Sequence, residues 1–351
     1  MRKVFIIVFV IIGDLIGAGF ASGQEIYSFF FSYGTKGILG LLLMSLLIAI
    51  LTNKSLKLIC ENEIDTYNEF LGIFIKNDKL TRIINIILNI LLVITFYIMI
   101  AGFGAYFKQE IGISKIIGSI TLAVLCFIIF LTNVKGVLKV SEYVVPILIV
   151  CIFIVGVKAI CTTNIEDIYI PVRKKGWFLS TIIYCSYNLI LLIPVLIPLR
   201  KQINRNTHIK YISALTGVIV FALSIIIFTL LTKADTDLAK LEMPIVYVIR
   251  TQFTELNKIY TFIMLSSIFT TAISIGIGIL QNASKNKKSY THSVIFLCIT
   301  SLLVSNFGFS KLINFAYPLF GYIGIAQIVL ILSKNVSMIF ENVPKFLKHK
   351  P

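Results

Sequence analysis

The chain has 351 residues, of which 58% are hydrophobic and only 14% are charged, and its mean hydropathy is +0.95. A soluble protein of this length needs far more polar surface, so the composition excludes one and predicts a polytopic membrane protein. The net charge of +16 predicts no nucleic-acid partner, because the basic residues lie in loops between apolar stretches, as membrane topology requires.

Cysteine and histidine indicate neither a metal site nor redox chemistry. The six cysteines are scattered, mostly in apolar stretches, no CxxC pair is present, and the three histidines form no cluster. The sequence also lacks a GxxxxGK[ST] segment, which argues against a nucleotide-driven pump. We therefore expect no metal, no cofactor and no enzyme activity.

Apolar windows between polar residues predict about ten transmembrane helices, each close to the ~20 residues that cross a bilayer. They divide into two halves, 1–160 and 177–332, followed by a basic tail at 333–351. We expect an all-α membrane protein with a 5+5 inverted repeat. The predicted spans cover 4–33, 37–56, 83–107, 113–131, 142–160, 177–199, 212–231, 259–280, 293–309 and 312–332.

The distribution of positive charge predicts the orientation. With both termini in the cytoplasm, 20 of the 32 Lys and Arg residues lie on the cytoplasmic side, although Arg173, Lys174 and Lys175 fall on the opposite one. The bias toward Ile, Lys and Asn is typical of an AT-rich bacterial genome. We therefore expect a multi-pass protein of a bacterial cytoplasmic membrane.

The first predicted span contains a glycine-rich stretch, "IIGDLIGAGFASGQEIYSFF", at 11–30. Each glycine weakens a helix by about 1 kcal/mol relative to alanine. On one interpretation, Gly13 with Gly17 and Gly19 with Gly23 are the small-xxx-small pairs that pack membrane helices together. On the other, the helix is interrupted here. A dinucleotide fingerprint is excluded, because no βαβ unit surrounds the glycines.

Asp14 favours the interruption. A carboxyl group near the bilayer midplane costs several kcal/mol unless it is paired, hydrated or protonated, so such residues are functional by default. Unwound backbone at that depth must line a cavity or be buried in protein, where its carbonyls can bind a cation. We therefore predict that the helix breaks at 16–19.

The sixth predicted span occupies the corresponding position in the second half. Ser186, Tyr187 and Asn188 interrupt its apolar run, and Pro194 and Pro198 each remove a backbone donor. The alternative is a proline-kinked helix in which Ser and Asn bond back to its own carbonyls. The position opposite the glycine-rich stretch favours a second break, so that helices 1 and 6 are both discontinuous and their breaks face each other.

The eighth predicted span carries hydroxyls on one face, because Ser267, Thr270 and Thr271 are spaced i, i+3 and i+4. Such hydroxyls can complete a site for a hard cation together with carbonyls of the first span. Alternatively, they bond to carbonyls of their own helix.

These spans resemble the LeuT-type fold of the amino acid–polyamine–organocation superfamily, and at the level of topology the resemblance covers nearly the whole chain. "GDLIGAG" at 13–19 is similar to the unwound segment of the family's first helix, with its GxxxGxG spacing. More narrowly, "GAGFASGQEI" followed by "FFSYGTKGILG" is similar to the YkvI-like bacterial membrane proteins, a largely uncharacterised group.

The resemblance implies alternating-access transport of a small molecule bound between the first and sixth spans. On this basis the substrate-binding residues are Asp14, Gly17, Ala18, Gly19, Phe20, Ser186, Tyr187 and Asn188. In sodium-coupled members, carbonyls of the first helix and groups of the eighth bind sodium. The matching positions here are Gly13, Ile16, Ser267, Thr270 and Thr271.

Asp14 and Glu25 each have two possible roles. The family's side chain at the position of Asp14 is often neutral, whereas an acid binds an amine or cation directly or carries a proton, so both Na+ and H+ remain candidates for the coupling ion. Glu25 is either a gate on the outward path or an acid favoured by the dipole at the start of a half-helix.

The sequence as a whole predicts an ion-coupled symporter of a small amino acid or amine, with the membrane lipid and the small-molecule substrate as partners. The alternative is a small-molecule sensor with a transporter fold, comparable to a germination-receptor subunit of spore-forming bacteria. Genes for receptor partners next to this one would favour the sensor, and uptake by the protein alone in liposomes would favour transport.

Overall fold

The computed structural model describes residues 2–131, 137–161, 170, 172–203, 206–283 and 287–334. Regular structure in these ranges is helical, apart from an isolated bridge between Tyr33 and Val172. The first half contains α1 (Arg2–Leu15), α2 (Ala18–Ala21), α3 (Gln24–Ile26), the π-helix η1 (Tyr27–Phe31), α4 (Lys36–Glu61), α5 (Tyr67–Gly72), α6 (Asp78–Tyr106), the π-helix η2 (Phe107–Ile111), α7 (Lys115–Leu131) and α8 (Val137–Cys161). The second half contains α9 (Trp177–Leu199), the short 3-10 helix η4 (Arg200–Gln202), α10 (Asn206–Leu231), the 3-10 helix η5 (Leu238–Lys240), α11 (Pro244–Gln252), α12 (Thr254–Ala283), α13 (Lys287–Ser305) and α14 (Phe309–Ser333).

Within the described ranges, six helices are long and apolar enough to cross a membrane. They lie at Lys36–Glu61, Lys79–Ile111, Trp177–Gln202, His208–Leu231, Thr254–Leu280 and Phe309–Ser333, and shorter apolar helices lie at Lys115–Leu131, Pro146–Lys158 and Tyr290–Ser305. The chain is thus a helical membrane protein with several spans. The total of about ten spans and the inverted repeat stay predictions.

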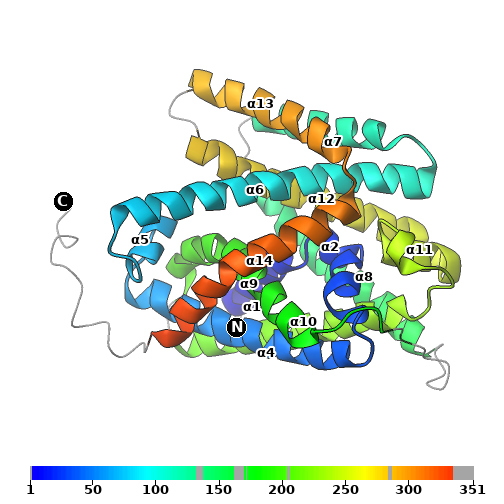
Figure 1. The fold of residues 1–351 in the computed structure, drawn as a ribbon, viewed down its shortest axis with the longest axis horizontal. Helices are drawn as coiled ribbons and strands as arrows, with labels where there is room; N and C mark the ends of the chain where they lie inside the picture. The colour runs from blue at the N-terminus through cyan, green and yellow to red at the C-terminus, as the bar shows by residue number, and fades with distance from the viewer. Residues whose placement is uncertain are drawn as a thin grey trace.

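The helices α1 and α9 lie near the centre of the molecule. In Figure 1, α14 passes in front of them, α4 and α10 lie below, and α6, α7 and α13 form a layer above. α9 packs against α14, α4 and α1, while α6 packs against α7, α12 and α13. α9 is apolar on nearly every side, as a helix enclosed by other helices must be. The buried face of α1 follows helical spacing and consists of Val4, Ile7, Val8, Ile11, Ile12 and Leu15.

The predicted break in the first span is confirmed. α1 ends at Leu15, and Gly17 is extended, with φ −77° and ψ −172°, before the helix resumes at Ala18. A second interruption follows at Gly23, whose φ of +81° lies in the left-handed region that glycine adopts without strain. The chain after α1 is therefore a series of short helical pieces rather than one rod.

The predicted break in the sixth span is wrong, because α9 is one continuous helix from Trp177 to Leu199. The Ser186 hydroxyl donates to the Ile182 carbonyl at 2.7 Å, and the Asn188 amide donates to the Tyr184 carbonyl at 3.0 Å. These side chains therefore reinforce their own helix instead of interrupting it. Helix 1 is discontinuous in this fold and helix 6 is not.

Candidate functional site

The break in the first span leaves polar groups without partners in the described part of the chain. Asp14, in the last turn of α1, is half-buried, and no hydrogen bond or ion pair reaches its carboxyl group from those residues. Among the same residues, the helical bond from the Gly17 N–H to the Gly13 carbonyl is not formed. A Cβ added at Gly17 would meet no atom within 4 Å, so open space adjoins the break. This open space near Asp14 is a candidate place for a small ligand.

The residues after the break are buried and held from several sides. Ala18, Gly19 and Phe20 are all buried. The Tyr260 hydroxyl of α12 donates to the Ala21 carbonyl at 2.5 Å, and the Ser22 hydroxyl donates to the Gly19 carbonyl at 3.1 Å. The carbonyl groups at this end of α2 are therefore occupied, and the accessible part of the break lies on the side of Gly17.

Glu25 lies inside the molecule, with only 4% of its surface exposed. Its Oε2 accepts two hydrogen bonds from α9, at 2.5 Å from the Tyr187 hydroxyl and at 3.1 Å from the Tyr184 hydroxyl. Its Oε1 lies against Gly19, where a Cβ would collide with it. The absence of a side chain at Gly19 thus gives Glu25 its position beside the broken helix.

The two tyrosines that bind Glu25 belong to an aromatic cluster. Tyr187 stacks on Tyr317 of α14 with ring centroids 4.6 Å apart. Tyr184 packs edge-on against Phe29 and Phe30 of the first span, at 5.3 and 5.0 Å. The sequence interpretation included Tyr187 but missed Tyr184 and Tyr317 as site residues. Spacing of i and i+3 was the available signal for Tyr184 and Tyr187, because it places both on one face of a continuous helix.

The other residues assigned to the sixth span lie in the buried interior of α9. Ser186 and Asn188 are 0% and 5% exposed, and both are engaged with carbonyls of their own helix. The backbone at Ser186 also packs closely against Gly324 of α14. The structure therefore brings Tyr187 to the broken segment, whereas the side chains of Ser186 and Asn188 bond to carbonyls of their own helix.

The hydroxyls of the eighth span lie in α12. Ser267 and Thr270 are buried and Thr271 is half-buried, and the Thr270 hydroxyl donates to the Ser267 carbonyl at 3.0 Å. Ile16, whose carbonyl was assigned to the same cation site, is buried at the break. The sodium site formed by these residues and Gly13 stays a prediction. Within the described residues, no three His, Cys, Asp or Glu side chains gather into a group that could hold a metal ion.

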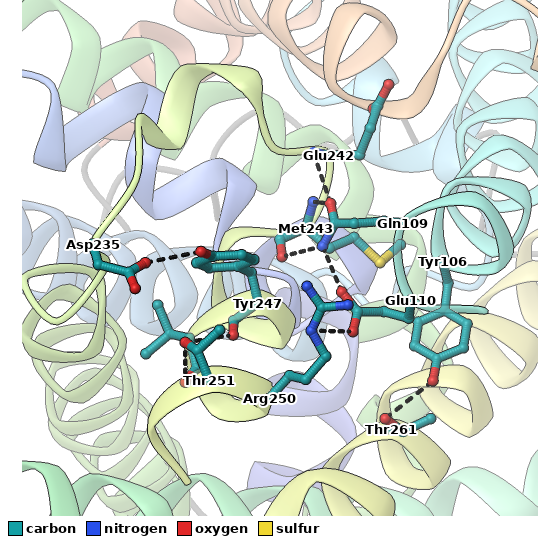
Figure 2. Close-up of polar contacts among 11 residues, drawn as sticks. Tyr106, Gln109, Glu110, Asp235, Glu242, Met243, Tyr247, Arg250, Thr251 and Thr261 are labelled. Carbon is teal, nitrogen blue, oxygen red and sulfur yellow. Dashed lines mark hydrogen bonds and ion pairs between the residues drawn. The ribbon is translucent and has the colours of Figure 1, made fainter. Parts of the chain in front are cut away.

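Polar contacts attach α11, and the segment before it, to the rest of the molecule (Figure 2). The Gln109 side chain of η2 accepts from the N–H groups of Glu242 and Met243, at 3.0 and 2.9 Å, and donates to the Met243 carbonyl at 3.0 Å. Glu242 in turn accepts from the Ser310 N–H at the start of α14, at 2.6 Å. This network fixes α11 between η2 and α14.

α11 also reaches the broken segment. The Ile245 N–H donates to the Ser22 carbonyl at 2.9 Å, and the Ile245 side chain packs against Gly23, where a Cβ would collide with it. α11 therefore covers the end of the broken segment.

A half-open cleft of about 250 Å³ adjoins the start of α9. Lys174 and Lys175 line it together with Ser28 and Asn314. The Lys174 ammonium donates to the Ser28 carbonyl at 3.2 Å, and its burial lowers the pKa of this side chain. The Ser28 hydroxyl donates to Asn314 at 2.6 Å, so the polar groups of this cleft largely satisfy one another.

The fold is similar to that of a solved transporter. Over 97% of this chain and 81% of the other, it matches the structure of Mhp1, a nucleobase-cation-symport-1 family transporter in a closed conformation with bromovinylhydantoin bound, with a TM-score of 0.63 and 11% sequence identity. At this identity the likeness shows the fold alone, and the fold is that of the LeuT-type transporters.

Sequence relatives define the family. The chain is 30% identical over 333 residues to the uncharacterized membrane protein YkvI of Bacillus subtilis (strain 168), covering 93% of this chain and 94% of that protein. It is 25% identical over 331 residues to the uncharacterized protein YyaD of the same organism, covering 92% and 94%. No family model matches the chain. The chain belongs to the family of YkvI-like membrane proteins.

Proposed function

We propose that this protein is an ion-coupled secondary transporter of a small amino acid or amine, whose substrate binds at the break in the first span. The observation that carries the proposal is the end of the interior helix α1 at Leu15. There Asp14, which has no partner among the described residues, lies beside open space at Gly17. A membrane protein keeps such an uncompensated acid in its interior only where a cation, an amine or a proton compensates it.

The substrate site of this proposal comprises Asp14 together with the exposed backbone at Gly17 and the neighbouring wall of α9. α1 and α9 are in contact, which supports a site shared by the two helices. Asp14 binds the amino group of the substrate, because an ammonium supplies both the opposite charge and three donors. A second, coupling cation binds the carbonyls of Gly13 and Ile16 with the hydroxyls of α12.

Transport then proceeds by alternating access. In this proposal two parts move relative to each other. One is the central pair of helices, α1 and α9, and the other is the layer of α6, α7, α12 and α13. The two repeats at 1–160 and 177–332, and the cytoplasmic location of both termini, belong to the same proposal. In the present conformation α11 covers the end of the broken segment through its contacts to Ser22 and Gly23.

The fold likeness supports a small-molecule transporter. Mhp1 is a nucleobase-cation-symport-1 family transporter, and its structure has the small molecule bromovinylhydantoin bound. The present chain carries Asp14 at its break, and this charge favours an amine over a neutral heterocycle as the substrate.

A thermal-shift screen of amino acids, amines and nucleobases, with and without sodium, tests the proposal. A ligand at ~100 times its dissociation constant should stabilise the protein by about 2.7 kcal/mol. The compound with the largest shift is then tested for uptake into liposomes that contain only this protein. Binding followed by uptake supports the transporter. Binding without uptake under any ion gradient would contradict it and favour the sensor, whereas an inert protein would contradict both.

A further inference from the structure

The proposed transport cycle leaves one buried acid without a role. Glu25 follows the turn at Gly23 and precedes the π-helix at Tyr27–Phe31, so it sits on the bent segment that links the break to α4. Chain bends of this kind are where rigid segments pivot when a membrane transporter changes conformation. A charge on this segment is therefore placed where it can influence that motion.

The described groups around Glu25 offer no positive charge. α2 and the stretch of α10 at 212–231 contain no titratable side chain, and Lys311 of α14, which also packs against α3, is exposed. The titratable neighbours are tyrosines: Tyr184 and Tyr187 bind the carboxyl group, Tyr317 stacks on Tyr187, and Tyr260 donates to the backbone of α2. Within the described residues, Glu25 takes part in no ion pair. A proton is the remaining means of neutralising this carboxylate without adding a ligand.

The hydrogen bonds differ between the two protonation states. The ionised carboxylate accepts both tyrosine hydroxyls on Oε2, and such charge-assisted bonds are roughly twice as strong as neutral ones. When a proton binds to Oε1, the oxygen beside Gly19, the group becomes neutral and both tyrosine bonds weaken. Ionised Glu25 thus binds the broken segment to α9 more tightly than protonated Glu25 does, in addition to the hydrogen bond from the Ser180 hydroxyl to the Phe29 carbonyl.

We propose that Glu25 is a proton-binding site that sets how tightly the broken segment is attached to α9, and that this proton is coupled to transport in addition to the cation at Gly13 and Ile16. The step is a simple transfer: one proton from water on one side of the membrane adds to the carboxylate, and the same proton leaves to water on the other side after the segment has moved. The coupling half of this inference rests on the proposed transport function.

The titration is tested without any substrate. Infrared difference spectra of the protein in liposomes, taken between about pH 9 and about pH 5, should show the carbonyl band of a protonated carboxylic acid that Glu25→Gln removes. Fluorescence of Trp177, the single tryptophan of the chain and part of α9, should change over the same pH range in the wild type and stay constant in Glu25→Gln. Glu110→Gln, which removes a buried acid that is paired with Arg250, should leave both signals unchanged.

A second variant covers the case in which Glu25→Gln does not fold. Replacing Tyr184 and Tyr187 together by phenylalanine removes both donors but keeps the rings, and it should move the midpoint of the carboxyl band. An unchanged band in Glu25→Gln would overturn the proton site, and a pH-independent Trp177 signal in the wild type would overturn its effect on the attachment of the segment to α9.

The coupling is tested by uptake of the compound with the largest thermal shift. An imposed pH gradient should raise uptake by the wild type at least tenfold, and Glu25→Gln should abolish that increase while it retains binding. Gradient-driven uptake that survives in Glu25→Gln would overturn this inference alone. A wild type that takes up nothing would instead contradict the proposed function and leave the titration of Glu25 as an independent result.

Discussion

Two glutamates with buried side chains show how differently an acid can be accommodated in this molecule. Glu110 of η2 has a side chain that is 4% exposed, and its carboxylate lies 3.4 Å from Arg250 and accepts from Gln109 at 2.9 Å (Figure 2). Glu25, with 4% of the whole residue exposed, is bound by two tyrosine hydroxyls and, among the described residues, by no cation. The two acids are thus alike in burial and differ in whether a positively charged partner is present among the described residues.

The two surroundings also have different structural roles. The contacts of Glu110, Gln109 and Glu242 fix α11 over the end of the broken segment, and their partners are backbone groups and one arginine. The contacts of Glu25 join the broken segment to α9 through two hydrogen bonds, whose strength depends on the protonation state of Glu25. The first set of contacts holds α11 in place, and in our proposal the second set weakens when Glu25 binds a proton.

The largest expected effect follows from Asp14, the acid that no described residue pairs. Asp14→Asn keeps the size of the side chain and removes its charge. Folding should survive or improve, because burying a charge is costly. Ion-coupled uptake should fall at least about tenfold, since this corresponds to a loss of only ~1.4 kcal/mol of interaction. Uptake, thermal stability and expression are measured in parallel, and wild-type uptake with unchanged ion dependence would remove Asp14 from the site.

Replacing Glu25 and Glu110 separately with glutamine distinguishes the roles of the two acids. Glu110→Gln should lower the free energy of unfolding by about 1 kcal/mol or less, because its arginine partner is partly exposed to solvent. Its ligand-induced thermal shift should stay as in the wild type. Glu25→Gln should leave stability unchanged or raise it, and should remove the pH dependence of uptake. The interpretation fails if the two variants behave alike in uptake.

Two glycines near the break provide a smaller test of the geometry. A methyl group at Gly19 collides with the Glu25 carboxyl group, whereas one at Gly17 enters open space. Gly19→Ala should therefore cost about 1–3 kcal/mol of stability through overpacking. Gly17→Ala should change stability by less, because its extended backbone accepts any residue. Equal thermal midpoints for the two variants would contradict the placement of Glu25 against Gly19.

The smallest expected effect concerns the loop outside the membrane-spanning helices. The Ala239 N–H and the Arg173 guanidinium, 2.7 Å away, lower the pKa of Asp237 below its ordinary value of 3.8. A lowered folded-state pKa gives a stabilisation that is present above the unfolded pKa and is lost as pH falls through the folded value. Asp237→Asn should thus slightly reduce stability at neutral pH and make no difference in strong acid. Thermal midpoints of the two proteins at several pH values measure the difference, and a constant gap down to the lowest pH would refute it.

The sequence correctly predicted the break in the first span, but it also predicted a break in the sixth span, where the helix is continuous. In the first span, the glycines weaken the helix and Asp14 requires a polar cavity, so both signals favour a break, and α1 ends where they occur. Ser186 and Asn188 carry an ambiguous signal, because the same side chains bond to the carbonyl four residues earlier and reinforce a helix. Pro194 and Pro198 lie within α9 without ending it.

Because a break was predicted in the sixth span, the hydrogen-bond partners of Glu25 were not predicted. Tyr184 and Tyr187 face the same way only if the helix between them and beyond is continuous. A break at 186–188 would have separated them, so the pair could not be inferred from the sequence interpretation. The path of the chain from Gly23 to Glu25, with its left-handed turn, depends on packing against Ile245 and was likewise beyond sequence reasoning.

Binding of a ligand in the space beside the break is tested by filling that space. Gly17→Val places a side chain there on extended backbone that suits a β-branched residue, and Gly278→Val is its control, because Gly278 of α12 also has no atom within 4 Å of an added Cβ. The measurement is the thermal shift produced by the compound with the largest shift in the wild type. We predict that Gly17→Val retains the unliganded thermal midpoint and loses the shift, while Gly278→Val retains both. A full ligand-induced shift in Gly17→Val would contradict ligand binding in this space.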